Sequence, residues 1–157
     1  MLVRLLNPKA LAAATLLALG PAAFAPPAFA AAPETYTAPF SKLAVGGYDP
    51  VSYFAGEGPL KGEARFAANW RGAEYRFASA ANLARFKASP EAFAPQYGGY
   101  CAWAVSRGYT AKGDPLVWRL VGGKLYLNYD LAVQKRWAAD IPGNIAKSDR
   151  NWPQVLK

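Results

Sequence analysis

The chain of 157 residues contains no histidine and a single cysteine, Cys101. Histidine titrates near neutral pH and is the commonest metal ligand, so its absence excludes Ser-His-Asp triads, Cys-His dyads and histidine-bound metals. One cysteine also excludes a disulfide within the chain. We therefore expect no catalytic residue, unless Cys101 is redox-active, and the sequence favours a role other than catalysis.

The first thirty residues have the pattern of a secretory signal peptide. Arg4 and Lys9 give a positive start, Ala10–Leu19 is apolar, and Ala28-Phe29-Ala30 places small residues where signal peptidase needs them. We predict a signal peptide over residues 1–30, with cleavage after Ala30 or one or two residues later. The apolar stretch is shorter than the roughly 20 residues of a membrane-spanning helix. The expected location is therefore the periplasm or the medium (a secreted protein), with no stable membrane insertion after cleavage.

The formal net charge is +8, but the lysines and arginines are scattered along the chain. Nucleic-acid-binding segments concentrate basic residues, so we expect no nucleic-acid partner. Contact with anionic lipid headgroups or envelope polymers is one interpretation of the charge. An ordinary solvated basic surface is the interpretation we favour.

Residues 31–41 are predicted to be a flexible lead-in, and residues 42–157 a single domain with one core. No internal repeat is evident in the sequence. Two runs of alternating residues, 64–77 around Arg71-Gly72 and 117–128 around Gly122-Gly123, predict two hairpins.

A further strand is predicted over Gly98–Val105, where alternation would place Cys101 and Trp103 on one face. Together these elements indicate an α+β fold. It would have a small antiparallel sheet of four to five strands (the two hairpins plus the Gly98–Val105 strand), with short helices packed on it.

The aspartates are interpreted as structural. Asp49 and Asp130 precede predicted helices and fit the cap position, as does Ser79. Asp114-Pro115 is typical of a turn. No two carboxylates have a spacing that indicates a general acid and base.

Several separated motifs resemble the YHS domain-containing proteins, in particular their exported bacterial branch. The resemblance covers roughly residues 42–153 and rests on five segments: Gly-Gly-Tyr-Asp-Pro-Val-Ser-Tyr-Phe (46–54), Tyr-Arg-Phe-Ala-Ser (75–79), Phe86 with Ser-Pro-Glu (89–91), Gln-Tyr-Gly-Gly-Tyr-Cys-Ala (96–102) and Lys-Leu-Tyr-Leu-Asn-Tyr (124–129). Metal-associated relatives carry cysteines where this chain has Ser52, Ala78 and Asn82, and the histidine that gives the domain its name is also missing. Soft metals need thiolate or imidazole ligands, so the departures argue against a metal site, and no cofactor is expected.

The resemblance also implies a redox position at Cys101, because the exported branch is described as including selenoproteins. Arg107, Gly98 and Gly99 could lower the pKa of the thiol through charge and backbone N–H donors. The competing interpretation is a small buried thiol packed beside Trp103, which is the more common fate of a free cysteine.

We expect an exported YHS-type domain that binds a small ligand or an envelope protein near the Gly98–Trp103 strand, without catalysis. The expected binding residues are Tyr48, Tyr97, Gly98, Gly99, Tyr100, Cys101 and Trp103, in which aromatic rings give contact area and glycines allow close approach. One alternative is a single-cysteine thiol redox protein that uses Cys101. Another is a residual copper or heavy-metal-associated protein in which Cys101 bridges two chains.

Overall fold

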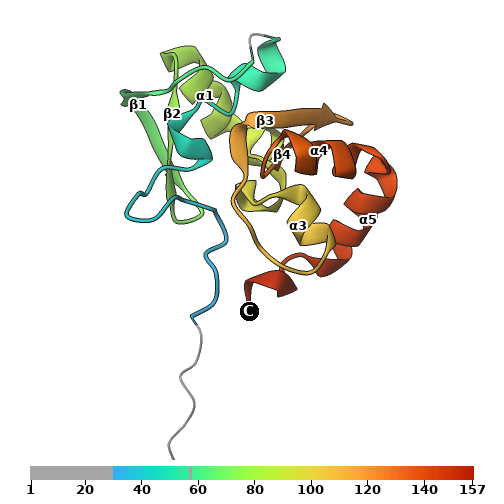
Figure 1. Ribbon diagram of the computed structural model, residues 1–157. Helices are drawn as coiled ribbons and strands as arrows, with labels where there is room; N and C mark the ends of the chain where they lie inside the picture. The colour runs from blue at the N-terminus through green and yellow to red at the C-terminus, as the bar shows by residue number, and fades with distance from the viewer. Residues whose placement is uncertain (1–29, 57) are drawn as a thin grey trace, which may run out of the picture.

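A computed structural model describes residues 30–56 and 58–157, so the signal peptide prediction lies outside the described residues except at Ala30. The described chain has an α+β fold with two small antiparallel sheets of two strands each and five α-helices (Figure 1). The strands are β1 (Glu63–Trp70), β2 (Ala73–Phe77), β3 (Asp114–Val121) and β4 (Lys124–Asn128). The α-helices are α1 (Ala80–Ala88), α2 (Pro90–Phe93), α3 (Ala102–Ser106), α4 (Leu131–Ala138) and α5 (Ile141–Asn151), and the 3-10 helices are η1 (Val45–Gly47), η2 (Ser52–Ala55), η3 (Gln96–Gly99) and η4 (Gln154–Leu156).

Both hairpins are confirmed, with β1 paired to β2 and β3 paired to β4. Each is closed by a two-residue turn in which both residues have positive φ: 45° and 78° at Arg71-Gly72, and 57° and 73° at Gly122-Gly123. Turns of this kind match the right-handed twist of the flanking strands. The short turn therefore sets the register of each hairpin.

The prediction of a strand over Gly98–Val105 is wrong. Tyr97, Gly98 and Gly99 have φ values of 54°, 60° and 85°, which turn the chain instead of extending it. The residues that follow form helix α3, in whose first turn the Val105 amide donates to the Cys101 carbonyl at 3.1 Å. The expected single sheet of four to five strands is consequently replaced by two separate hairpins.

The two hairpins belong to a structural repeat. Every boundary of the second hairpin lies 51 residues after its counterpart in the first (63 to 114, 70 to 121, 73 to 124 and 77 to 128). The same spacing relates the N-caps of α1 and α4: Ser79 accepts a hydrogen bond from the Asn82 amide (3.1 Å) and Asp130 accepts one from the Val133 amide (2.7 Å). This repeat is present in the fold although no internal repeat is evident in the sequence.

The repeat begins before the hairpins. Val45, Gly46 and Gly47 have φ values of 52°, 59° and 79°, close to those of residues 97–99, at a spacing of 52 residues. Each left-handed run is followed by a tyrosine that makes an isolated antiparallel bridge to a lysine, Tyr48 to Lys61 and Tyr100 to Lys112. We refer to residues 45–93 as the first unit and residues 97–151 as the second unit.

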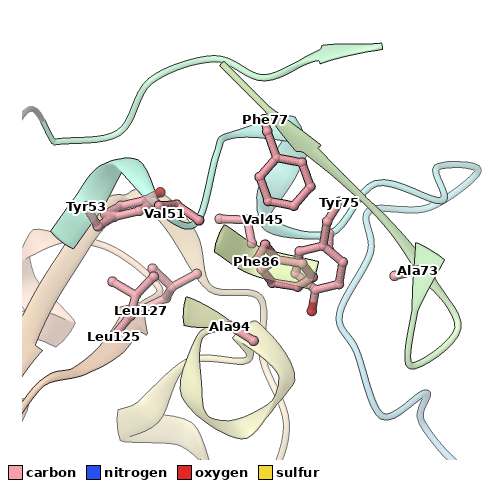
Figure 2. Packing of buried hydrophobic residues seen from close by; sticks show 11 residues of the cluster. Val45, Val51, Tyr53, Ala73, Tyr75, Phe77, Phe86, Ala94, Leu125 and Leu127 are labelled. Atoms are coloured by element: carbon pink, nitrogen blue, oxygen red, sulfur yellow. The ribbon is translucent and has the colours of Figure 1, made fainter. Parts of the chain in front are cut away.

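Two apolar clusters form the core, and strand β4 separates them. The first cluster gathers side chains of the first unit, such as Val51, Tyr75 and Phe86, together with Leu125 and Leu127 of β4 (Figure 2). The second cluster contains Tyr97, Tyr100, Ala102, Val105, Tyr126 and Trp137. Because side chains alternate along a strand, one face of β4 completes the first cluster and the other face joins the second.

The segment predicted as a flexible lead-in packs across both units. The Ala32 amide donates to the Leu156 carbonyl at 2.7 Å, and the Tyr36 amide donates to the Gly98 carbonyl at 2.9 Å. Thr35 is only 3% exposed. The Thr35 hydroxyl also donates to the Arg71 carbonyl of the first unit at 3.1 Å. We call residues 32–37 the strap, since they contact both units and helix η4.

Among residues 30–56 and 58–157, no helix has both the length and the apolar character needed to cross a membrane.

Candidate functional site

The structure divides the seven predicted binding residues. Tyr97 and Gly98 line a cleft at the seam between the two units, which we call the seam cleft. Cys101 and Trp103 line a different cavity, which we call the Cys101 cavity. The remaining three residues, Tyr48, Gly99 and Tyr100, line neither of these.

Tyr48, Gly99 and Tyr100 have structural roles. Tyr48 is half-buried against the first cluster, with the Lys61 ammonium 3.8 Å from its ring centroid. Gly99 is buried at a φ of 85°, a conformation that favours glycine. The Tyr100 hydroxyl donates to the Pro33 carbonyl at 2.8 Å, so this ring anchors the start of the strap.

The seam cleft has a volume of about 380 Å³. Its walls come from the strap, the β1–β2 turn, the α2–η3 segment, the β3–β4 turn and α5, so both units contribute. The lining residues are Glu34, Thr35, Trp70, Arg71, Glu91, Ala94, Pro95, Gln96, Tyr97, Gly98, Lys124, Asp149 and Trp152. Cavities of this size accommodate small molecules.

Arg71 is the centre of charge on one wall of the seam cleft. Its guanidinium lies 2.9 Å from a Glu34 carboxylate oxygen and 3.7 Å from one of Glu91, and 4.4 Å from the centroid of the Trp70 ring. Both ion pairs are substantially exposed, with side-chain exposures of 43%, 51% and 68%. Exposed pairs contribute little stability, so these groups can exchange partners with a ligand at low cost.

Tyr97 also lines the seam cleft. Its hydroxyl donates to Asp149 Oδ1 at 2.8 Å. Burial, together with this hydrogen bond to a carboxylate, raises the pKa of Tyr97, which keeps the phenol protonated as a neutral donor. Its left-handed φ of 54° is unusual for a residue other than glycine, and such strained positions cluster at functional sites.

Gly98 is required where the strap crosses the second unit. A Cβ atom at this position would overlap the carbonyl oxygen of Glu34. The absence of a side chain therefore lets the strap approach the η3 backbone and places Glu34 at the edge of the seam cleft.

The Cys101 cavity has a volume of about 290 Å³ and is lined by Cys101, Trp103, Ala104, Tyr109, Ala111, Tyr129, Val133 and Arg136. Cys101 is 1% exposed, and its Sγ donates to Asn128 Oδ1 at 3.8 Å. Burial raises the pKa of the thiol and outweighs the lowering by the backbone N–H groups of Ala104, Tyr129 and Trp103. A protonated, buried thiol is a weak nucleophile.

Asp49 joins the start of the first unit to the β2–α1 corner. Its Oδ1 accepts from the Val51 amide at 2.8 Å, and its Oδ2 accepts from the Ala78 amide (2.9 Å) and from Asn82 Nδ2 (2.7 Å). Ser52 Oγ donates to the Asp49 carbonyl at 2.8 Å. Asp49 is therefore a structural residue, although it does not cap η2, whose N-cap is Val51. Ser52, Ala78 and Asn82 all contact it.

Asp130 and Asp114 also hold the backbone. Asp130 caps α4, as predicted, and Asp114 accepts from the Leu116 amide at 2.8 Å at the start of β3. Within the described ranges, no three cysteine, aspartate or glutamate side chains gather closely enough to hold a metal ion.

Sequence reasoning missed most of the seam cleft. Glu34, Arg71 and the pair Asp149 and Trp152 at the end of α5 come from three distant segments, and no local pattern links them. Of these residues, only Arg71 had a recognisable sequence feature. It stands beside a turn glycine, which places a long charged side chain at the exposed tip of a hairpin. No family model, curated protein or solved structure matches the chain.

Proposed function

We propose that the protein is an exported binding module that holds a small polar ligand in the seam cleft and catalyses no reaction on it. The single observation that carries this proposal is the cleft of about 380 Å³ shared by both units and the strap. Ligand sites typically lie between structural units, where side chains from distant segments converge. The strained Tyr97 at its wall supports the same position.

The charges favour a ligand with groups of both signs. Arg71 and Lys124 can receive a carboxylate, whereas Glu91 and Asp149 can receive an ammonium group. Trp70 and Trp152 supply aromatic surface. A zwitterion such as an amino acid or a short peptide combines these requirements in the available volume.

We also propose that the domain is of YHS type and that it acts in the periplasm or outside the cell. The convergence of Ser52, Ala78 and Asn82 on Asp49 supports the resemblance, because the positions that it equates with metal ligands meet at one place. Amino-terminal sequencing of the protein recovered from a periplasmic fraction tests the export. A mature chain beginning at residue 31, 32 or 33 is the expected result.

The thiol redox and metal-associated alternatives have less support. Redox chemistry needs an accessible thiolate, whereas Cys101 is buried and its pKa is raised. Thiol labelling of the folded protein at a rate close to that of the unfolded protein would restore the redox alternative. Stoichiometric copper(I) binding would restore the metal-associated one, with a second chain as the source of further ligands.

Isothermal titration with a panel of amino acids and dipeptides tests the proposed function. Binding by at least one member is expected, with affinity lowered about tenfold or more in Arg71→Gln, since a charge-assisted hydrogen bond is lost. Arg119→Gln removes an equal charge from an exposed position outside the cleft and should bind as the original protein does. Absence of binding across the panel, or an equal loss in both variants, contradicts the proposal and would favour a protein partner.

A further inference from the structure

The structural repeat gives the Cys101 cavity a counterpart in the first unit. Asp49 precedes η2 as Cys101 precedes α3, at the spacing of 52 residues that relates the two left-handed runs. In the first unit, the Asp49 carboxylate fills this place and bonds to the Ala78 amide and the Asn82 side chain.

The second unit leaves the same place partly empty. The counterparts of Ala78 and Asn82, 51 residues later, are Tyr129 and Val133, and both line the Cys101 cavity. The Tyr129 amide faces the sulfur of Cys101. A thiol is smaller than a carboxymethyl group and Val133 has no polar atom to reach it, so a cavity of about 290 Å³ remains.

The walls of this cavity are largely apolar, and its charge is positive. Trp103, Tyr109, Tyr129 and Val133 supply aromatic and aliphatic surface, and Arg136 is the one charged residue that lines it. In the part of the chain that the structure describes, no carboxylate lies within ion-pair distance of Arg136. An apolar cavity with one such cation at its edge is complementary to an organic anion.

Two further cations stand over the rings that line the cavity. The Arg107 guanidinium is 3.9 Å from the Trp103 ring centroid, and the Lys112 ammonium is 4.9 Å from that of Tyr129. The nearby acidic group is Asp130, whose carboxylate is engaged in capping α4. The balance of charge around the cavity is therefore positive.

Asn128 adds an unused donor beside the cavity. Its side chain is fully buried, and its Oδ1 faces Cys101 Sγ (3.8 Å) and the Trp103 amide (3.3 Å). Its Nδ2 has no hydrogen-bond partner. Leaving a buried amide donor unpaired is costly, although Asn128 itself is not among the residues that line the cavity.

We propose that the Cys101 cavity is a binding site for a small aromatic carboxylate. The ring lies among Trp103, Tyr129 and Val133, and the carboxylate pairs with Arg136. This site is distinct from the seam cleft, shares no lining residue with it, and does not depend on the function proposed for that cleft.

Titration with benzoate, followed by nitrogen-15 NMR, tests the proposal. The Trp103 indole and the Tyr129 and Val133 amides should shift in a saturable manner, whereas signals of the seam cleft should not move. Benzyl alcohol, a neutral molecule of similar shape, should bind about tenfold or more weakly, because it cannot form the ion pair. No saturable shift, or equal affinities for the two molecules, overturns the proposal.

Two variants locate the contacts. Arg136→Gln should weaken benzoate binding about tenfold and leave benzyl alcohol binding unchanged, while Arg119→Gln serves as the matched control. Val133→Phe should fill the cavity and abolish binding of both molecules. Retention of benzoate affinity in Arg136→Gln overturns the proposal even if Val133→Phe fails to fold, because Arg136 is exposed and its replacement leaves the core intact.

Discussion

The two units have the same order of elements, but they use their second strands differently. In β2, Ala73, Tyr75 and Phe77 face the first cluster, while Glu74 and Arg76 pair with each other on the opposite face at 2.7 Å. In β4, the positions equivalent to Glu74 and Arg76 are Leu125 and Leu127, which are fully buried in the first cluster. Strand β2 therefore contributes one face to the apolar core, whereas β4 contributes residues from both of its faces, Leu125 and Leu127 on one and Tyr126 on the other.

This difference explains how two small units form one protein. A hairpin with two short helices has too little core to be stable alone. Here Leu125 and Leu127 of the second unit complete the core of the first, next to Val51 and Tyr53 (Figure 2). Tyr126, between them in the strand, belongs to the second cluster. The polar pair on β2 limits its own unit to a single cluster.

Replacing one residue on β4 and its counterpart on β2 should show most clearly that the β4 position is part of the core and that the β2 position is not. Leu127→Ala should lower the free energy of unfolding by about 2–5 kcal/mol, because it opens a cavity in the first cluster. Arg76→Ala, at the equivalent position, should cost no more than about 1 kcal/mol, since it removes a partly exposed ion pair. Urea denaturation measures both values, and similar costs would contradict the comparison.

Alkaline pH should probe an equivalent pair of buried phenols. Burial raises the pKa of Tyr75 to about 12, and burial together with Asp149 raises the pKa of Tyr126. Below pH 10 these phenols are protonated in both the folded and the unfolded chain. Between pH 10 and 12 the unfolded state releases the Tyr75 proton first, so stability falls, by roughly 2–3 kcal/mol for Tyr75.

Tyr75→Phe should therefore flatten the loss of stability above pH 10, and Tyr126→Phe should act in the same direction. The measurement is the free energy of unfolding at pH values from 8 to about 12, starting from the ordinary phenol pKa of about 10. Neutral-pH stability should change little in Tyr75→Phe, because the Tyr75 hydroxyl makes no hydrogen bond of ordinary geometry, although the Thr35 side chain lies near it. If the dependence of stability on alkaline pH were unchanged in both variants, burial of these phenols would not be the cause of the loss of stability above pH 10.

The left-handed glycines at equivalent positions distinguish the two units through the strap. Gly46→Ala and Gly98→Ala share the cost of a positive φ, about 1 kcal/mol. Gly98→Ala also forces a Cβ against the Glu34 carbonyl, whereas a Cβ at position 46 lies 3.3 Å from Pro115 Cγ. Gly98→Ala should therefore lower the free energy of unfolding by about 2 kcal/mol more than Gly46→Ala does. Limited proteolysis should cleave near the strap only in Gly98→Ala, and equal behaviour would argue against the strap contact.

The smallest expected effect concerns the two turns. Gly122 and Gly123 both have positive φ, and a Cβ at position 122 would meet no atom within 4 Å. Gly122→Asn should stabilise the protein by about 0.5 kcal/mol, since Asn-Gly suits this turn and the unfolded chain loses freedom. Thermal denaturation measures the gain, and destabilisation would show that the turn differs from its counterpart at Arg71-Gly72.

The sequence predicted the elements whose signals are local. Both hairpins carry a turn glycine between alternating residues, and Ser79 and Asp130 are followed by helices they cap. The alternation that includes Cys101 and Trp103 is typical of a strand. The segment is not a strand, because left-handed residues precede Cys101 and helix α3 follows it. The two residues do line one cavity, although helical geometry brings them there.

The repeat and the seam cleft could not be predicted, for a shared physical reason. The residues that differ between the units, such as Leu127 against Arg76, are those whose surroundings are set by the other unit. The cleft likewise depends on how the units and the strap pack, because its residues extend from Glu34 to Trp152. Neither is encoded within a short stretch of chain.

The hydrogen bond between Ala32 and Leu156 has a consequence for the order in which the protein assembles. A chain that emerges from its amino terminus onwards cannot form this hydrogen bond until Leu156 has been synthesised. Closure is consequently a late event that follows synthesis of both units. A precursor that stalls before residue 149 also lacks Asp149 and Trp152, which line the seam cleft.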